Sequence, residues 1–418
     1  MPDPGGTASE WARSGAMALT GPADGSPSLA PGAPATAIAE AMARFAAVSA
    51  TAPESLPTGT LLGERAAAAG HRRRAPRSVG GSFRSLAATD GWLGISLPRS
   101  TDLELVPALV ERAVEEPWSA VAEWAARMPV AEAVSRARLL GLAAAAVAEK
   151  PPRPRRKPVE RRGGGPRPHA RRGPPLVIDF TSLWAGPLCA HLLGLAGARI
   201  VKVESSNRPD GARFGPTAFY DLLHAGHASV ALDFGSPDAV AALRCLLRRA
   251  DVVLEASRPR ALARLGVDAD EYVDAGVVWA GITAYGRRGR DADSIGFGDD
   301  VAAAAGLTAI ADGVPYPVGD AIADPLTGAH AAAEVAAALR LDRGALLDIS
   351  MFDVAVAAAS RPGEAALVVG DQRQGWMVET DAGRVSVAAP SIRRCGRRAA
   401  SLGADTRSVF AGCILEHE

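Results

Sequence analysis

The chain has 418 residues, and its 46 lysines and arginines balance 46 aspartates and glutamates, so the formal net charge is zero. This length suits two or three domains with a sizeable core, and the balanced charge favours neither nucleic acid nor a membrane surface as a partner. The four cysteines, Cys189, Cys245, Cys395 and Cys413, lie far apart, which disfavours a disulfide framework or a zinc site and predicts a reduced, cytoplasmic setting.

The alanine-rich apolar runs, such as Leu139–Ala148, are too short to span a bilayer. The first ten residues, MPDPGGTASE, lack the basic and apolar regions of a signal peptide. We therefore expect a soluble intracellular protein without a membrane partner.

The first 150 residues are predicted to be mostly helical. Helices are expected over Ile38–Val48 and, with an interruption near Pro129, over Val106–Ala148. Between them, Gly80–Ser96 has the pattern of a hairpin that turns at Asp90 and Gly91. Alanine is so frequent in this chain that it indicates helix only weakly.

Residues 151–173 form a low-complexity tract with nine lysines and arginines against one glutamate. Such a tract can be a nucleic-acid-binding arm or an extended, self-repelling linker. It contains no aromatic residue that could stack on a base, and the rest of the chain is balanced in charge. We therefore interpret it as a linker, with no nucleic-acid partner.

Residues 175–204 have the pattern of a strand, a tight turn, a helix and a second strand. Leu176–Phe180 is apolar enough to be buried on both faces of a sheet, Pro187 suits a helix start, and Ile200–Val203 forms the next strand. The turn, Thr181–Pro187, lacks the G-x-G-x-x-G pattern that lets backbone approach a pyrophosphate. The segment therefore predicts a Rossmann-like scaffold with a ligand other than NAD.

The strand and helix alternation continues downstream. Strands are predicted at Val230–Asp233, Val252–Glu255, Val277–Thr283 and Ala345–Ile349, and helices at 237–249, 261–274, 297–305 and 325–339. This order predicts an α/β fold with a doubly wound, mostly parallel sheet. A weak internal echo relates Ser14–Gly32 and the helix after it to Ala305–Gly319 and the helix after that.

Asp324 is the strongest candidate for chemistry. It directly precedes Pro325, so it can be a plain helix cap. It can also be a carboxylate nucleophile at the positive end of a helix, near backbone N–H groups that hold an oxyanion. For that second role, backbone N–H groups over 316–320 and at the helix start are the hypothetical donors.

Other polar residues carry weaker signals. Asp299 and Asp300 are adjacent, which favours capping over a shared-proton pair, and Ser182 lacks the context of a hydrolase nucleophile. His224 and His227 flank a turn, and no group of residues has metal-ligand spacing, so no metal is expected. Lys202 and Arg264 are cations near predicted carboxyl ends of strands, where α/β sheets bind ligands, although solvated surface charge is the default interpretation of each.

In this region the sequence resembles the family III CoA-transferases, a family that includes formyl-CoA and carnitine CoA-transferases and shares its fold with α-methylacyl-CoA racemases. The resemblance covers residues 175–353 and rests on an ordered set of segments. They are VIDFTSLWAGP, LLGLAGARIVKVES, SVALDF, ADVVLEASRPRALARLGV, GITAYGRRG, GFGDDVAAAAG, PVGDAIADPLTGAH and GALLDISMFD.

The resemblance implies that Asp324 is the catalytic aspartate. It also implies coenzyme A as co-substrate and, as partners, an acyl-CoA, a carboxylic acid and a second copy of the chain in a homodimer. Phe297 stands where the racemases have a histidine, so CoA transfer is favoured over racemisation. The positions that the resemblance assigns to CoA are Leu183, Trp184, Ala185, Lys202, Glu204, Ser205, Leu232, Ala256, Ser257 and Arg264.

Several positions depart from the family pattern. Ala256 and Ser257 replace a frequent Asn-Phe pair, and Trp184 is unusual in its turn. The predicted organisation is a family-like segment over 1–150 that supplies a smaller α+β domain, a linker over 151–174, a catalytic domain over 175–360 and a return segment over 361–418. In the N-terminal copy, Ala37 stands where the aspartate would be. A racemase or isomerase, and an inactive CoA-binding homologue, stay open as alternative functions.

Overall fold

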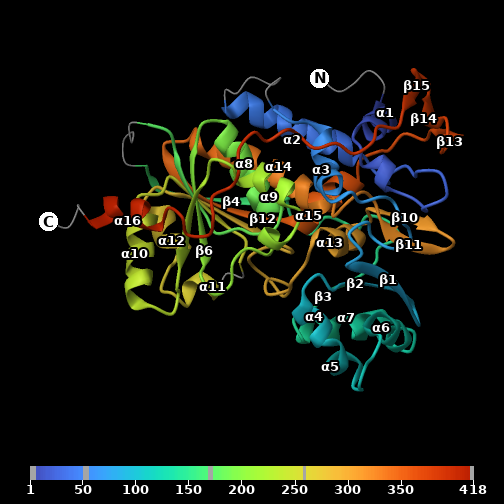
Figure 1. Ribbon diagram of the computed structural model, residues 1–418, viewed down its shortest axis with the longest axis horizontal. Coiled ribbons are helices and arrows are strands. Elements are labelled where there is room, and N and C mark those ends of the chain that lie inside the picture. Colours follow the sequence, from blue (N-terminus) through green and yellow to red (C-terminus); the bar gives the residue numbers. More distant parts are fainter. Residues whose placement is uncertain (1–5, 50–55, 168–172, 258–259, 415–418) are drawn as a thin grey trace.

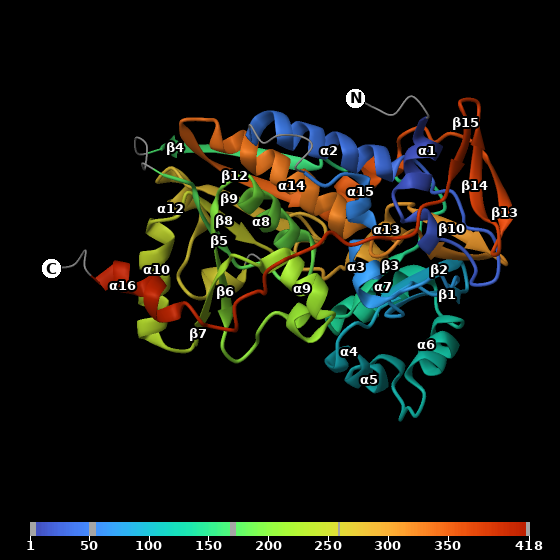
Figure 2. The same ribbon diagram turned by 45° about the horizontal axis from the view of Figure 1, so that its top comes forward.

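The computed structural model describes residues 6–49, 56–167, 173–257 and 260–414. A large body is built around a seven-stranded sheet, and a smaller lobe lies to one side of it (Figure 1). The same arrangement is visible after a rotation (Figure 2). The predicted α/β class with one large sheet is confirmed.

The large sheet has the strand order β4-β12-β9-β8-β5-β6-β7. All neighbouring pairs are parallel except β4 with β12. Its parallel strands are β5 (Leu176–Asp179), β6 (Arg199–Ser205), β7 (Ala228–Leu232), β8 (Val252–Glu255), β9 (Val278–Thr283) and β12 (Arg343–Ser350). Each overlaps a predicted strand, because buried parallel strands are continuous apolar runs that stand out in the sequence.

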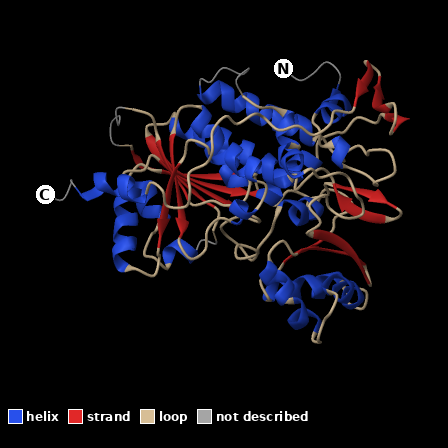
Figure 3. Cartoon of the chain, in the orientation of Figure 1, coloured by secondary structure: helices blue, strands red, loops and turns tan. Residues whose placement is uncertain are grey.

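Helices cover both faces of this sheet (Figure 3). Successive residues of β5 point to opposite faces, so Val177 joins one hydrophobic cluster and Ile178 another. The first face carries α8 (Ala185–Leu195), α13 (Gly298–Ala304), α14 (Ala323–Leu339) and α15 (Met351–Ala359). The second carries α10 (Pro237–Arg248), α12 (Ala269–Asp274) and α16 (Thr406–Ile414).

Shorter elements complete the body. They are α9 (Thr217–His224), α11 (Arg260–Ala263), and the hairpin of β10 (Thr308–Ala311) and β11 (Val314–Pro317). The predicted helix over 261–274 is in fact two helices, α11 and α12, with a turn at Gly266 whose φ of 65° suits glycine.

The N-terminal residues divide between the body and the lobe. Helices α1 (Gly6–Arg13), α2 (Pro34–Ser49) and α3 (Glu64–Ala69) belong to the body, where α2 packs against α14. Buried side chains of α2 such as Ile38 and Phe45 join the same hydrophobic cluster as α14. Residues 6–49 and 56–69 are therefore part of the large body, and the prediction that 1–150 as a whole forms a small domain is wrong for them.

The lobe has its own core. It contains the sheet β1-β2-β3, with β1 (Phe83–Ala88), β2 (Gly91–Ser96) and β3 (Ala143–Ala146), and the helices α4 (Ser100–Glu104), α5 (Val106–Val110), α6 (Pro117–Ala125) and α7 (Val130–Leu139). The predicted hairpin is confirmed, with Ala88 paired to Gly91 across the turn. The prediction of helix through Ala148 is wrong, because the alanines of β3 pair with β2 as a strand.

Part of the basic tract is a strand. β4 (Val159–Pro166) pairs with β12 at the edge of the large sheet, so the interpretation of a free linker is wrong for these residues. Carboxylates that are far away in the sequence offset the repulsion among the arginines of the basic tract. Arg156 donates to Asp348 at 2.6 Å, and Arg162 donates to Asp270 at 2.7 Å.

The C-terminal residues first form a separate antiparallel sheet of β13 (Leu367–Asp371), β14 (Gly375–Thr380) and β15 (Gly383–Ser386). This sheet lies beside α1, and Ala388 N donates to Ala12 O at 2.8 Å just beyond it. The chain then crosses the body to α16, where the Asp405 carboxylate accepts a hydrogen bond from Ser229 N of β7.

Candidate functional site

Asp324 lies in the first turn of α14. The residue that caps the helix is Ile322, and within the described residues no hydrogen bond reaches the Asp324 carboxylate. The interpretation of Asp324 as a plain cap is therefore not supported. Burial raises the pKa of Asp324 to about 7, the charge on Arg65 opposes this shift, and neighbouring aspartates add to it. The carboxyl group thus titrates near neutral pH, as groups that react with substrates often do.

The loop before Asp324 is tightly held. Ala321 has a φ of 44°, a left-handed conformation that is unusual for a residue other than glycine. Its N–H donates to the Asp299 carboxylate at 3.0 Å, and Gly319 N donates to Thr20 Oγ at 2.9 Å. Since Val318 N donates to Leu307 O, the backbone donors hypothesised over 316–320 are already occupied at residues 318 and 319. Strained backbone that the surroundings fix in place is a recurrent property of functional loops.

Asp320, four residues before Asp324, is fully buried and forms an ion pair with Arg65 of α3. Arg65 Nε donates to one carboxylate oxygen of Asp320 at 3.0 Å, and Nη2 donates to the other. The guanidinium of Arg65 lies 5.2 Å from the centre of the Trp184 ring. Burial tends to lower the pKa of Arg65, but the charge and hydrogen bonds of Asp320, together with the charges of Asp299 and Asp324, outweigh it, so the pKa is raised and Arg65 stays cationic.

Helix α13 contributes two more carboxylates. Burial is the main cause that raises the pKa of Asp299 to about 6 and of Asp300 to about 7. Asp300 accepts hydrogen bonds from Phe297 N at 2.9 Å and from Ser96 Oγ of the lobe at 2.7 Å. A Cβ atom on Gly298 would collide with a carboxylate oxygen of Asp324 and with Ala321 O, so only glycine leaves room for both.

Lys202 fixes the turn Thr181–Pro187, which carries three of the residues predicted to bind CoA. The side chain of Lys202 is buried, donates to Thr181 O at 2.8 Å and pairs with Asp210 at 2.9 Å. Asp210 also accepts from Leu183 N at 3.0 Å. Lys202 therefore positions the turn, and its ammonium group is buried with two of its three donors directed to Thr181 O and Asp210.

Within the turn itself, three residues predicted to bind CoA differ in exposure. Leu183 is 42% exposed and has a φ of 69°, so its side chain projects from a strained backbone. Trp184 and Ala185 are buried, and the Trp184 ring packs edge-on against Phe219 at 5.3 Å. Because Arg65 contacts both Trp184 and Asp320, this turn and the loop of Asp324 belong to one connected site.

The remaining predicted CoA residues lie near the carboxyl ends of parallel strands. Glu204 and Leu232 are buried, and Glu204 forms an ion pair with Arg213. Ser205 ends β6, Ala256 and Ser257 follow β8, and Ser257 Oγ donates to Glu255 at 3.0 Å. Arg264 is exposed. Among the described residues, none of these side chains forms a hydrogen bond or an ion pair with Asp324.

Arg65 was not predicted as a site residue. It lies in an alanine-rich helix, 255 residues away from its partner Asp320. No local pattern marks it, because its role depends on the contact between α3 and the loop after β11.

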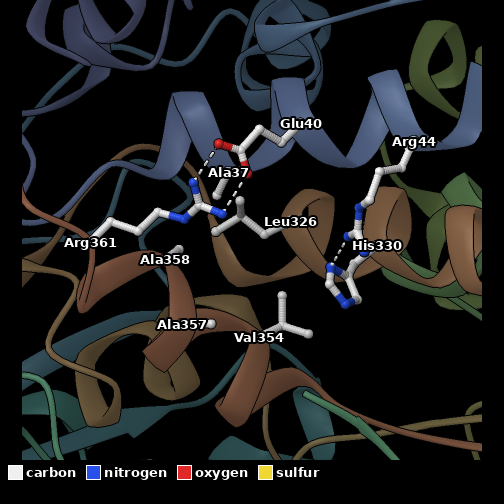
Figure 4. A pocket seen from close by; sticks show the side chains of 9 residues that line it. All are labelled: Ala37, Glu40, Arg44, Leu326, His330, Val354, Ala357, Ala358 and Arg361. Carbon is white, nitrogen blue, oxygen red and sulfur yellow. Dashed lines mark hydrogen bonds and ion pairs between the residues drawn. The ribbon is translucent and has the colours of Figure 1, made fainter. Parts of the chain in front are cut away.

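A separate cavity of about 290 Å³ lies between α2, α14 and α15 (Figure 4). Arg361 and Glu40 form a two-fold hydrogen-bonded ion pair at one end, and Arg44 contacts His330 at the other. The residues that line it include neither Asp324 nor any position predicted to bind CoA.

The described residues contain no helix that is both long and apolar enough to cross a bilayer. They also hold no group of three or more histidine, cysteine or carboxylate side chains arranged to bind a metal ion.

Comparisons with known proteins match this chain to CoA-transferases. It is 31% identical over 209 residues to a succinate–glutarate CoA-transferase of Agrobacterium fabrum, covering 44% of this chain and 52% of that protein. It is 34% identical over 200 residues to a probable fatty acyl-CoA transferase of Mycobacterium tuberculosis, covering 43% of this chain and 50% of that protein. The chain thus spans about half the length of the curated relatives it matches.

A crystal structure of the M. tuberculosis protein superimposes with a TM-score of 0.44 at 29% identity, covering 51% of this chain and 64% of that one. The family model for CoA-transferase family III matches residues 176–412, which is more than half of the sequence. The chain belongs to CoA-transferase family III.

Proposed function

We propose that this protein is an acyl-CoA:carboxylate CoA-transferase in which Asp324 is the nucleophile. The observation that carries the proposal is the Asp324 carboxyl group, which lacks a hydrogen-bond partner among the described residues, lies in the first turn of α14 and titrates near pH 7. The positive end of the helix favours the carboxylate form, which is the form that attacks.

The exchange proceeds in covalent steps. An Asp324 oxygen attacks the thioester carbonyl of the donor, the C–S bond breaks, and CoA thiolate leaves behind an acyl-aspartyl anhydride. The thiolate then attacks the aspartyl carbonyl, which releases the donor acid and forms an aspartyl-CoA thioester. The acceptor carboxylate then attacks the aspartyl-CoA thioester, which releases CoA thiolate and forms a second anhydride. The thiolate attacks the acceptor carbonyl of this anhydride, so the new acyl-CoA forms, Asp324 is regenerated and no proton is consumed.

Coenzyme A is proposed to lie over the carboxyl ends of the parallel strands. In chain order the strands β5, β6, β7, β8, β9 and β12 are arranged β7-β6-β5-β8-β9-β12, which supports a Rossmann-like doubly wound sheet with its switch point beside β5. The exposed Leu183 and the residues Ser205, Ala256, Ser257 and Arg264 remain the proposed contacts. Lys202 and Glu204 are instead assigned to holding the turn.

The organisation of the chain is proposed accordingly. Residues 175–360 form the catalytic domain, residues 361–418 return to it, and the lobe over 83–146 takes the place of the small domain. A cytoplasmic homodimer is the proposed state in the cell, and light scattering of the purified chain would measure its mass.

The test is covalent trapping. The full chain is incubated with a panel of acyl-CoA donors and carboxylate acceptors. The first pair is succinyl-CoA and glutarate, because the Agrobacterium relative is named a succinate–glutarate CoA-transferase. Hydroxylamine should convert Asp324 to a hydroxamate that peptide mass spectrometry locates. D324A should lower CoA exchange by at least about 10³-fold, the range seen when a nucleophile is removed. D342A, at an exposed aspartate, is the matched control and should keep full exchange. Retained exchange in D324A would contradict the proposal.

A second candidate is an acyl-CoA racemase or isomerase of the same fold. Phe297 precedes α13 where the related racemases carry a histidine, so a racemase would need a different second base. His71 of the N-terminal segment is a histidine whose pKa responds to the Asp320 charge, and we name it as the residue to test for that role. Deuterium incorporation at the α-carbon of an acyl-CoA in D₂O, without CoA exchange, would favour this candidate.

A further inference from the structure

Arg65 connects three parts of the candidate site. It lies on α3, outside the stretch that matches the family, and its guanidinium is fixed in two ways. Two of its nitrogens bind both carboxylate oxygens of the buried Asp320, and its face lies 5.2 Å from the centre of the Trp184 ring. A guanidinium held by a carboxylate fork and an aromatic face has little freedom to move.

The N-terminal segment also holds the loop that leads into Asp324. Thr20 accepts a hydrogen bond from Gly319 N, Arg65 binds Asp320, and Asp299 of α13 accepts from Ala321 N. Three consecutive residues of this loop are therefore fixed, two of them by the N-terminal segment. The strained φ of Ala321 requires such external support.

We propose that Arg65 is a positioning residue that holds the loop leading into Asp324 and places a fixed cation close to the Asp324 carboxyl group. The segment before the family-like stretch would thereby complete the site. The consequence for catalysis rests on the function proposed above. The electrostatic part concerns Asp324 itself and can be measured without any turnover.

The charges around Asp324 give this role a direction. The charges of Asp299 and Asp300 on α13 and of Asp320 in the preceding loop act against the Asp324 carboxylate. Arg65 on α3 acts in its favour, and the pKa of His71 responds in turn to the charges of Asp320, Arg65 and Arg74. Like charges disfavour the carboxylate and a cation favours it, so Arg65 and Asp320 act on Asp324 in opposite directions although they form one ion pair.

This opposition separates an electrostatic role from a purely structural one. If the pair only held the loop in place, R65M and D320N would break the same contact and disturb Asp324 in the same way. If the field of Arg65 matters, R65M removes the favourable charge and raises the pKa of Asp324. D320N removes a repelling charge, frees Arg65 and lowers that pKa.

The experiment follows the protonation of Asp324 in the full chain. Carbodiimide with an amine probe labels carboxyl groups in a pH-dependent way, and peptide mass spectrometry gives the midpoint at Asp324. We expect the midpoint to rise by about one pH unit in R65M, a roughly tenfold loss of ionised Asp324 near pH 6, and to fall in D320N. R65K keeps the positive charge but cannot bind both oxygens of Asp320 as the guanidinium does. Its Asp324 midpoint should therefore lie between those of R65M and the unmodified chain.

Each result decides the inference. Opposite shifts in R65M and D320N support it, whereas shifts in the same direction, or none, overturn it. If R65M does not fold, D320N decides alone, since a lowered midpoint supports the inference and an unchanged or raised one overturns it. Opposite shifts without CoA exchange in the unmodified chain would remove the proposed function and leave the role of Arg65 standing. Exchange without the shifts would remove the role of Arg65 alone.

Discussion

Among the buried clusters of charge in the described residues, two combine a cation with several aspartates near the candidate site. In the first, Lys202 pairs with Asp210 and donates to Thr181 O. In the second, Arg65 pairs with Asp320 beside Asp299 and Asp324. From the sequence, only Lys202 of these two cations was a candidate for ligand binding, because it lies near the predicted carboxyl end of a strand.

The two clusters differ in the partners of their carboxylates. Asp210 pairs with Lys202 and accepts from Leu183 N and Ala212 N. Asp179 accepts two hydrogen bonds from Thr181 through one oxygen, while its other oxygen is buried without a hydrogen-bond partner among the described residues and burial raises its pKa. In the Arg65 cluster no hydrogen bond reaches the Asp324 carboxylate among the described residues, and burial raises its pKa to about 7. Because Asp210 and Asp179 both have fixed partners and Asp324 has none in the described part of the chain, we assign structure to the first cluster and chemistry to the second.

The largest expected effect is on the stability of the Lys202 cluster. K202M leaves Asp210 buried without its cation, and breaking a buried ion pair in this way costs about 3–5 kcal/mol. Urea denaturation at pH 7 measures the loss. R264M is the matched control, because Arg264 is exposed and had the same predicted role, and its stability should change by less than about 0.5 kcal/mol. A K202M variant as stable as R264M would mean that the turn does not depend on Lys202.

These clusters also indicate what the sequence could and could not predict. The parallel strands of the large sheet were predictable because their apolar runs are local, and Asp324 could be singled out as a candidate because its loop and helix are contiguous in the chain. Lys202 lies in β6 as predicted, but its side chain is buried against Asp210 and is not a solvated surface charge. Arg65 and β4 were missed because their partners, Asp320 and β12, lie far away in the sequence.

A smaller effect is expected where Asp324 meets α13. G298A would bring a Cβ atom against the Asp324 carboxylate and Ala321 O, and such overpacking costs about 1–3 kcal/mol. The displaced carboxylate should also lower CoA exchange. G396A is the control, since a Cβ atom there meets nothing within 4 Å. Equal stability and exchange in the two variants would contradict the close fit of Gly298 around Asp324.

The smallest effect is a pH-dependent gain in stability when Asp324 loses its charge. The pKa of Asp324 is 3.8 in the reference state and about 7 in the folded protein, so between these values the folded state holds the extra proton. Stability therefore falls as the pH rises through this window, and the full cost is present above pH 7. D324N cannot ionise and should be more stable than the unmodified chain by about 1–2 kcal/mol at pH 8, with no gain at pH 4. D342N, at an exposed aspartate, should show no such difference. A loss of stability in D324N at pH 8 would mean that Asp324 is a satisfied structural carboxylate like Asp210, and the contrast between the two clusters would disappear.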